Sequence, residues 1–239
     1  MPLSTSNSPP ANKLLASLPA PQYQRLTPYL EEVSLPVGQV LYEPGEVIQY
    51  VYFPNQAMVS LVSILEDGST AEVGMVGNDG IVGYPVFLEG NLTTHRAIVQ
   101  IEDTAMRMNA ETLKTEFNRG ETLQKLLLRY TQALLTQVSQ TAACNRHHPL
   151  EERLARWLLT AHDYSLSDEL PLTQEFISNM LGTRRASVTV AAGMLQQAGV
   201  IRYNRGKITI INRDALEATA CECYSVVKRE YQRLLDSRI

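Results

Sequence analysis

The chain has 239 residues and a net charge of −4, and its 44% hydrophobic and 19% charged residues argue against a disordered or fibrous protein. This length allows two domains that each bury a core of their own. No apolar run approaches the ~18 residues of a membrane helix, no secretory signal is evident, and three cysteines provide no disulfide framework, so we expect a cytoplasmic protein with no membrane segment.

Residues 1–13 are rich in Ser and Pro and are predicted to form a disordered lead. In the next segment, residues 14–109, short β-prone runs alternate with turn sequences such as Pro44-Gly45 and Asp67-Gly68. Strands this short and evenly spaced predict a sandwich or barrel-like roll. No helix-length pattern lies between them, so a parallel βαβ sheet is not expected. The predicted strands are Val40–Tyr42, Tyr50–Phe53, Met58–Ile64, Ala71–Met75, Ala97–Ile101 and Ala105–Met108.

Residues 110–144 have neither proline nor an alternating run and are predicted to form one long helix. Two apolar stripes run along it. One can pack on the chain's own β domain, but the other requires a second neighbour, which favours a homodimer. The first stripe follows coiled-coil-like spacings of four and three, and we predict the dimer interface there. The predicted interface residues are Leu123, Leu127, Tyr130, Leu134 and Thr141, and the second stripe is Leu128, Leu135 and Ala142.

The domain boundary is predicted between Cys144 and Pro149, because Pro149 suits the first turn of a new helix. Farther on, Thr173 is the predicted N-cap of a short helix, and Gly182 suits the left-handed position that ends it. Thr183 is the predicted cap of a second helix, which Gly199 ends. So short a turn predicts two crossed helices with the second at the surface. The predicted inward residues are Ile177, Met180 and Leu181 in the first helix and Val188, Ala191, Ala192 and Leu195 in the second.

The outward face of this second helix is predicted to meet DNA. It consists of Ala186, Thr189, Val190, Gly193 and Gln197, where an ordinary solvent-exposed face would carry Lys and Glu. Small side chains permit close approach to a major groove, in which Ala and Val contact thymine methyl groups. Arg184 and Arg185 begin the helix, where its dipole disfavours cations, so an external phosphate or guanine would offset that cost.

A β-hairpin follows, with Asn204-Arg205-Gly206 as its turn and Arg205 and Lys207 placed to rest on phosphates. Between Pro171 and Arg213 there are six basic residues and one acid, a net charge of +5, which leaves −9 for the rest of the chain. A basic segment on an acidic body is typical of a protein that binds double-stranded DNA through one module.

The order of these segments resembles the Crp/Fnr family of bacterial transcription regulators, over about residues 14–212. The segments that carry the resemblance are LPVGQVLYEPGE (35–46), RLARWLL (153–159) and LTQEFISNMLGTRRASVTVAAGMLQQAGVI (172–201) with the hairpin. The resemblance implies an α+β fold: a cyclic-nucleotide-binding-type β-roll, jelly-roll-like, at 14–109, a dimerisation helix at 110–144, and a winged helix-turn-helix at 149–239. It further implies operator binding, contact with RNA polymerase, and no enzymatic activity or catalytic residues.

The predicted DNA-binding residues are Thr173, Thr183, Arg184, Arg185, Ala186, Ser187, Thr189, Val190, Arg205 and Lys207. By resemblance, Arg185, Ser187 and Thr189 occupy recognition-helix positions that meet DNA. The cyclic-AMP receptor protein has Glu and Arg where this chain has Ala186 and Val190. That difference implies a different half-site.

The family's cyclic-nucleotide pocket uses a Gly-Glu-Leu turn for the ribose and an Arg-Ser or Arg-Thr pair for the phosphate. Here Tyr84-Pro85 follows Gly83 and Thr93-Thr94 replaces the pair. A buried phosphate without a cation is poorly compensated, so we expect an effector other than a cyclic nucleotide, with Arg96 as the alternative phosphate ligand. The predicted effector pocket is Gly83, Tyr84, Thr93, Thr94 and Arg96. Since no cysteine precedes Cys144, we expect no iron–sulfur cluster.

Two further residue groups have alternative interpretations. Cys144, His147 and His148 have the spacing of metal ligands, and Cys221 and Cys223 offer further thiolates, but a buried cysteine beside exposed histidines explains the same residues, and we predict no metal site. A redox-sensing thiol stays open. Haem ligation by His95 is the less favoured alternative to a solvated histidine in a polar loop.

Asn212 is the predicted cap of a last helix with Leu216, Ala220, Tyr224, Val227 and Tyr231 along one side, which we expect to cover the DNA-binding domain or to extend the dimer contact. Two other functions are compatible with fewer of these features. A cyclic-nucleotide-binding regulatory subunit acting on a protein partner has no use for the helix-turn-helix. A cupin-type metalloenzyme needs a cluster of His and carboxylate ligands, and only His95 lies in the β region.

Overall fold

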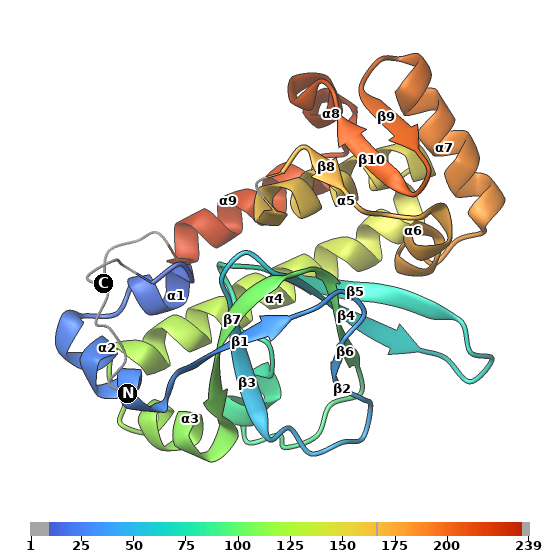
Figure 1. Cartoon of the computed structure of the whole chain (residues 1–239). Helices are drawn as coiled ribbons and strands as arrows, with labels where there is room; N and C mark the ends of the chain where they lie inside the picture. The colour runs from blue at the N-terminus through green and yellow to red at the C-terminus, as the bar shows by residue number, and fades with distance from the viewer. Residues whose placement is uncertain (1–9, 166, 236–239) are drawn as a thin grey trace.

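The computed structural model describes residues 10–165 and 167–235. A β-roll lies against a long helix, and a smaller domain of helices and a three-element sheet lies at the far end of that helix (Figure 1). The α+β fold predicted from the sequence is confirmed. Within the described residues, every helix is either too short or too polar to cross a lipid bilayer.

The β-roll consists of two antiparallel sheets with strand orders β1-β7-β3 and β2-β6-β4-β5. Its apolar core includes Phe53, Val59 and Val99, which are fully buried. Each strand predicted from the sequence is present within a residue or two, and β1 is an addition. The strands are β1 (Glu31–Leu35), β2 (Val40–Tyr42), β3 (Tyr50–Pro54), β4 (Met58–Ile64), β5 (Thr70–Val76), β6 (Arg96–Ile101) and β7 (Asp103–Asn109).

The helical structure begins within the segment that we expected to be disordered. Helix α1 (Lys13–Ala16) is followed by α2 (Ala20–Leu26) and a 3-10 turn, η1 (Thr27–Tyr29). Asn12 is buried, caps α1 through its side-chain oxygen, and donates hydrogen bonds of 3.0 Å to the carbonyls of Pro54 and Gly80. This side chain ties the start of α1 to the β-roll, which the composition of the segment did not indicate. Residues 1–9 of the predicted lead lie outside the described residues.

The single helix predicted over residues 110–144 is two helices, α3 (Ala110–Phe117) and α4 (Thr122–His147). The chain turns between them at Gly120, whose φ of +74° is a left-handed conformation that glycine adopts without steric cost. Helix α4 runs along β5. The absence of a side chain at Gly74 permits this close approach, because a Cβ there would lie 3.0 Å from Oε1 of Gln137. That oxygen accepts a hydrogen bond of 2.7 Å from the Met75 amide, which explains a polar residue in an otherwise apolar stripe.

The C-terminal domain is built on α5 (Leu150–Ser165). Its core joins Trp157 and Leu158 to residues of the following helices, and it continues onto the outer face of the β-roll through Met58 and Met75. The two domains therefore share an apolar interface. The remaining elements are β8 (Glu169–Leu170), α6 (Gln174–Met180), α7 (Arg185–Gln197), β9 (Ile201–Asn204) and β10 (Lys207–Ile210), with sheet order β8-β10-β9.

The single helix predicted after Asn212 is also two helices, α8 (Arg213–Thr219) and α9 (Cys223–Leu235). Helix α8 packs on α5 within the C-terminal domain, whereas α9 leaves this domain and lies along α4 (Figure 1). The rings of Tyr231 on α9 and Tyr130 on α4 meet edge to face, with centroids 6.4 Å apart. Helix α9 thus packs residues 223–235 against the long helix.

Candidate nucleic-acid interface

The crossed helices α6 and α7 form as the sequence predicts, with one change at the turn. Thr173 caps α6, since its Oγ1 accepts a 3.1 Å hydrogen bond from the Phe176 amide, and Gly182 is left-handed with a φ of +57°. The prediction that Thr183 caps α7 is wrong: Arg184 is the N-cap residue, without a side-chain cap bond. The Thr183 amide donates to the Ser178 carbonyl instead, which closes the turn one residue earlier.

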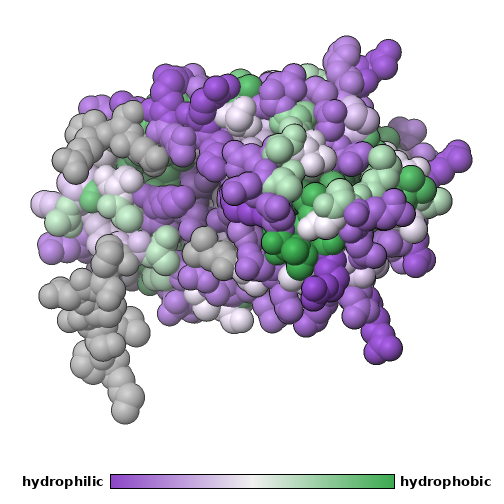
Figure 2. Space-filling model, turned by 90° about the horizontal axis from the view of Figure 1, so that it is seen from above, coloured by the Kyte–Doolittle hydropathy of each residue, from purple (hydrophilic) through white to green (hydrophobic). Residues whose placement is uncertain are grey.

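Helix α7 lies at the outer edge of the molecule, away from the β-roll (Figure 1). Its predicted inner stripe, Val188, Ala191, Ala192 and Leu195, is buried in the domain core. The opposite face is exposed, with Val190 64% accessible, and a side chain at Gly193 would meet no atom within 4 Å. Other exposed apolar residues of this domain are Met194 and Ile211, and Figure 2 shows apolar surface on this half of the molecule.

Arg184 and Arg185 stand exposed at the start of α7. Within residues 10–165 and 167–235, neither guanidinium has an acidic partner. The free backbone amides of the first turn lie beside them, so cationic side chains and the positive end of the helix dipole face the same region of solvent. This arrangement favours an anion supplied from outside the chain.

A residue of α6 that the sequence analysis did not select contacts the outer face of α7. The Thr189 hydroxyl donates 2.8 Å to Oε1 of Gln174, and it also lies 3.1 Å from the Arg185 carbonyl. The side chain of Gln174 therefore borders the exposed surface and leaves its amide nitrogen for another acceptor. Its position one residue after the cap of α6 was the only available signal.

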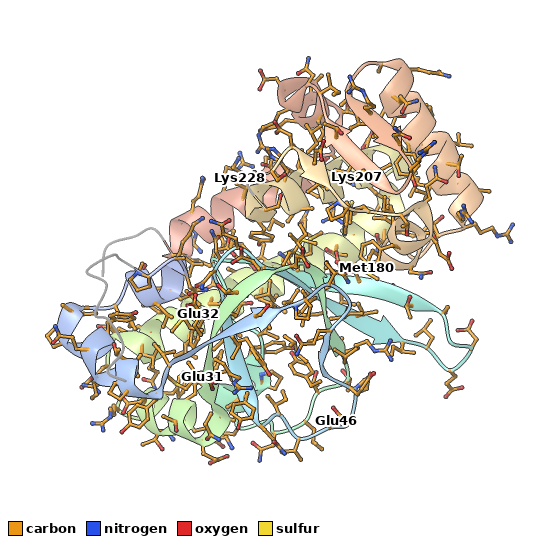
Figure 3. All side chains as sticks on the ribbon, in the orientation of Figure 1. Glu31, Glu32, Glu46, Met180, Lys207 and Lys228 are labelled. Atoms are coloured by element: carbon orange, nitrogen blue, oxygen red, sulfur yellow. The ribbon has the colours of Figure 1, made fainter. Side chains whose placement is uncertain are left out.

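The predicted hairpin is present as β9 and β10, and its turn is left-handed at both Arg205 (φ +48°) and Gly206 (φ +81°). Strand β8, which the sequence analysis missed, pairs with β10. Lys207 lies 3.5 Å from Glu169 of β8 in an exposed ion pair. Such a pair contributes little free energy, so Lys207 can still bind a phosphate. Lys207 belongs to the C-terminal domain, whereas the acidic residues Glu31, Glu32 and Glu46 lie on the β-roll (Figure 3).

One cation of the basic segment is not available. Arg213 donates 2.6 Å to Asp163 and contacts His162 and Tyr224, so it belongs to the joint between α5, α8 and α9. The remaining cations, Arg184, Arg185, Arg202, Arg205 and Lys207, are exposed. The exposed cations of the basic segment therefore lie at the start of α7 and on the hairpin.

The predicted effector-pocket residues all lie in the β-roll, and the one cation among them, Arg96, is already paired. Gly83 is left-handed (φ +99°) and precedes the 3-10 helix η2 (Tyr84–Leu88). Thr93 is buried, Thr94 is exposed, and Arg96 donates 2.8 Å to the carboxylate of Glu43. The guanidinium thus already has an anionic partner. His95 is half-buried, its Nδ1 has no hydrogen-bond partner in the described part of the chain, and burial lowers its pKa.

The residues predicted to form the dimer interface are buried within the chain. Leu123, Leu127, Tyr130 and Leu134 are at most 4% exposed, because they belong to the apolar core that α4 shares with the β-roll, and Thr141 lines an internal cavity. The second stripe is the exposed one: Leu128 and Leu135 are 49% and 64% accessible. It continues at spacings of three and four through the exposed residues Lys125, Leu128, Gln132, Leu135, Ser139 and Ala142, here called the outer stripe.

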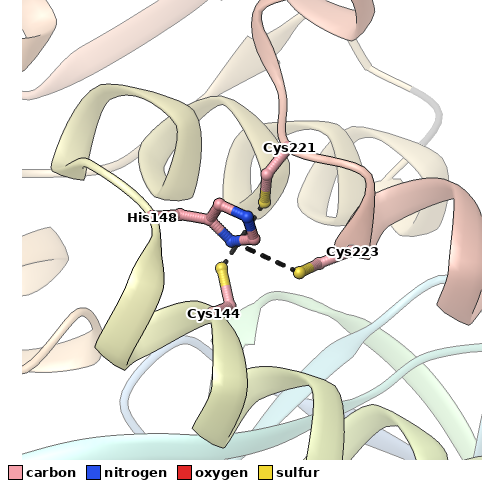
Figure 4. Close-up of side chains that lie close together, drawn as sticks. All are labelled: Cys144, His148, Cys221 and Cys223. Carbon is pink, nitrogen blue, oxygen red and sulfur yellow. Dashed lines mark hydrogen bonds between the residues drawn. The ribbon is translucent and has the colours of Figure 1, made fainter.

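The cysteines are not isolated. Cys144, Cys221 and Cys223 are buried against one another, and His148 turns inward to join them, so the expectation of exposed histidines holds for His147 alone (Figure 4). The pKa of Cys144 is lowered, chiefly by a hydrogen bond from the Cys221 thiol, whose own pKa rises. The pKa of His148 is raised, chiefly by hydrogen bonding to Cys144.

Two protein-family models match the chain: a cyclic nucleotide-binding domain over residues 32–119 and a Crp-like helix-turn-helix domain over residues 152–219. Among similar proteins, the Global nitrogen regulator of Nostoc sp. (strain PCC 7120) is 22% identical over 182 residues, which are 72% of this chain and 82% of that protein. The Fumarate and nitrate reduction regulatory protein of Salmonella typhi is 24% identical over 197 residues, 77% of this chain and 76% of that protein.

Solved structures share the fold over most of the chain. FixK2 from Bradyrhizobium japonicum superposes with a TM-score of 0.68 at 18% identity, covering 80% of this chain and 98% of that one. A transcriptional regulator of the CRP family from Thermus thermophilus superposes with a TM-score of 0.66 at 21% identity, covering 79% and 96%.

Proposed function

We propose that this chain, which belongs to the Crp/Fnr family of DNA-binding transcription regulators, reads its operator as a homodimer in the cytoplasm. The observation that carries the proposal is the outer face of α7, where Arg184 and Arg185 lie exposed beside small residues such as Ala186. Small side chains permit close approach to base edges, and the arginines contact phosphate or guanine.

The outer stripe of α4 supports the homodimer. Its residues follow the alternating three-and-four spacing of a coiled-coil contact, and Leu128 and Leu135 present apolar side chains to solvent. Pairing two copies of α4 about a two-fold axis would bury these side chains and place one α7 on each side of the axis. The two recognition helices would then enter successive major grooves, roughly 34 Å apart.

The effector is proposed to act through the β-roll and to be something other than a cyclic nucleotide. The ion pair between Arg96 and Glu43 supports this, because a phosphate would have to displace a carboxylate already 2.8 Å from the guanidinium. Binding would shift the balance between dimer forms at the hinge around residues 145–149. Mass spectrometry of ligands that copurify with the protein identifies the effector, and calorimetry that detects cyclic AMP binding would refute this part.

The promoter-bound dimer is further proposed to contact RNA polymerase, as the family resemblance implies. Transcription in vitro from a promoter carrying the operator tests this contact.

Hydroxyl-radical footprinting on genomic fragments selected by the protein tests the DNA-binding mode. We expect two protected patches on one face of the duplex, about one helical turn apart, related by sequence symmetry. Equal binding to every sequence, or one protected patch at a stoichiometry of one chain, would overturn the proposal.

A further inference from the structure

Four metal-ligand side chains from distant parts of the chain meet beside the hinge. Cys144 lies in the last turn of α4, and His148 is the C-cap residue that follows this helix. Cys221 lies in the link between α8 and α9, and Cys223 begins α9. Their three sulfur atoms and one imidazole nitrogen all lie within 4.8 Å of one another (Figure 4). Both family matches, residues 32–119 and 152–219, leave all four residues outside.

Two of the separations match the edges of a tetrahedron around a single ion, and none exceeds 4.8 Å. Sγ of Cys144 is 3.5 Å from Sγ of Cys221, and Sγ of Cys223 is 3.5 Å from Nδ1 of His148. Zinc bonds of ~2.3 Å to sulfur and ~2.0 Å to nitrogen give tetrahedral edges of roughly 3.5–3.8 Å. The sulfur atoms are too far apart for a disulfide, and an iron–sulfur cluster, which distributes its thiolates over several irons, would spread them more widely.

The surroundings of His148 are those of a ligand, not of a packing residue. Its Nε2 lies 3.3 Å from the carboxylate of Glu222, a partner that would hold the ring proton on Nε2 and leave Nδ1, which faces the thiols, free to bind a metal ion. A carboxylate behind a metal-bound imidazole fixes the tautomer and the ring orientation in this way. Apolar packing alone would explain three buried cysteines but not an imidazole whose Nδ1 faces their sulfur atoms.

Polar groups around the thiols also suit a bound ion. Three thiolates and a neutral imidazole around a divalent ion leave one net negative charge. Arg156 lies within electrostatic reach of Cys144, is 7% exposed, and has a buried Nε without a hydrogen-bond partner among the described residues. Gln140 donates 3.4 Å to Sγ of Cys223. Charge compensation and a hydrogen bond to sulfur are the usual second layer around a thiolate site.

We propose that Cys144, His148, Cys221 and Cys223 bind one zinc ion, which fixes the hinge between α4 and α5 to the start of α9. Soft thiolate ligands with one imidazole in tetrahedral arrangement select zinc. Helix α9 also packs along α4. The ion would therefore connect the end of α4 to the start of α9 beside the hinge, and so would fix the orientation of the DNA-binding domain. Metal occupancy therefore controls operator affinity, a consequence that rests on the proposed function.

Metal analysis of the full-length protein, purified under reducing conditions, tests the site directly. We expect one zinc per protomer, lost in Cys223→Ala and retained in the matched control His147→Ala, whose side chain is exposed on the same helix. Glu222→Gln lowers zinc affinity by about 10–100-fold, the usual cost of losing a partner of a metal-bound histidine. Iron with sulfide in place of zinc, or equal zinc in the Cys223→Ala and control proteins, would overturn the proposal.

Cobalt titration of the wild-type protein after chelation keeps the test independent of variant folding. Tetrahedral thiolate coordination gives intense visible bands and a sulfur-to-cobalt charge-transfer band. A protein that takes up neither cobalt nor zinc after reduction of its thiols would overturn the site.

Operator binding, measured before and after chelation, separates the two proposals. We expect zinc removal to weaken binding by about 5–150-fold, the range of coupling between two sites, with recovery on adding zinc. Zinc at one per protomer with no operator binding under any condition would reject the proposed function and leave the metal site standing. Unchanged operator affinity of the zinc-free protein would reject the control of affinity by the metal.

Discussion

The indole nitrogen of Trp157 donates a 2.8 Å hydrogen bond to Oε1 of Glu72, across the apolar interface between the DNA-binding domain and the β-roll. The hydroxyl of Ser60 donates to the other carboxylate oxygen. All three side chains are buried, so α5 is joined to β4 and β5 by polar groups that water does not reach. Because a buried hydrogen-bonded group requires its partner in place, this contact defines one orientation of the two domains.

The same contact makes stability dependent on pH. Burial raises the pKa of Glu72 from 4.5 to about 7, so the folded protein holds a proton there that the unfolded chain has lost. Stability therefore falls as the pH rises between these two values, by on the order of 3 kcal/mol for this group. Glu72→Gln keeps an acceptor for Trp157 and a polar group for Ser60 but cannot titrate. The free energy of unfolding of this variant, measured with urea at about pH 5 and pH 8, should therefore lack the pH dependence that Glu72 causes. Identical pH slopes in the two proteins would contradict a buried, neutralised Glu72.

Arg185→Ala should weaken discrimination between operator and unrelated DNA. The exposed guanidinium at the start of α7 is placed to contact a base edge, and its loss should cost roughly 1–3 kcal/mol of specificity. Competitive gel-shift titrations measure this difference. Arg229→Ala, which removes an exposed arginine on α9, is the control and should keep full discrimination. If both variants discriminate equally, base readout by Arg185 is excluded.

Arg205→Asn should reduce salt dependence without loss of stability. The left-handed φ of +48° at Arg205 is a conformation that asparagine tolerates, so the hairpin turn should persist while its charge is removed. Loss of one phosphate contact should lower the slope of log affinity against log salt by about 1, with similar weakening on every sequence. Affinity measured over about 50–200 mM salt provides the slope. A change in sequence preference would point instead to base contact by the hairpin.

Leu135→Asp should dissociate the homodimer without unfolding the protomer. This side chain is 64% exposed on the outer stripe, so a charge there is tolerated in the monomer but would be buried against its copy in the pair. Sedimentation velocity measures the state of association. Leu65→Asp is the matched control, since Leu65 is 62% exposed at the turn between β4 and β5.

A dimer that survives Leu135→Asp would place the contact elsewhere. Leu127→Ala serves as the opposite control, because Leu127 is fully buried within the chain. It should lower the free energy of unfolding by about 2–5 kcal/mol and leave the folded dimer assembled.

Local sequence determined the elements that bind DNA. The spacing of Ile177 and Met180 in α6, the left-handed glycine between the helices, and the buried stripe of α7 each depend on residues within a few positions of one another. The short strands of the β-roll follow from the same kind of signal, alternation and turn residues. The breaks at Gly120 and before Cys223 were missed because the apolar spacing continues across them.

The tertiary structure decided which surfaces are free and which distant residues meet. Both stripes of α4 contain leucines at helical spacing, but only the tertiary packing shows that Leu127 is inside and Leu135 outside. Cys144 and Cys221 are 77 residues apart in the chain, and no periodicity links them. Spacing along a helix or strand encodes which side chains share a face. What covers that face depends on contacts between segments far apart in sequence, and these exist only once the chain is folded.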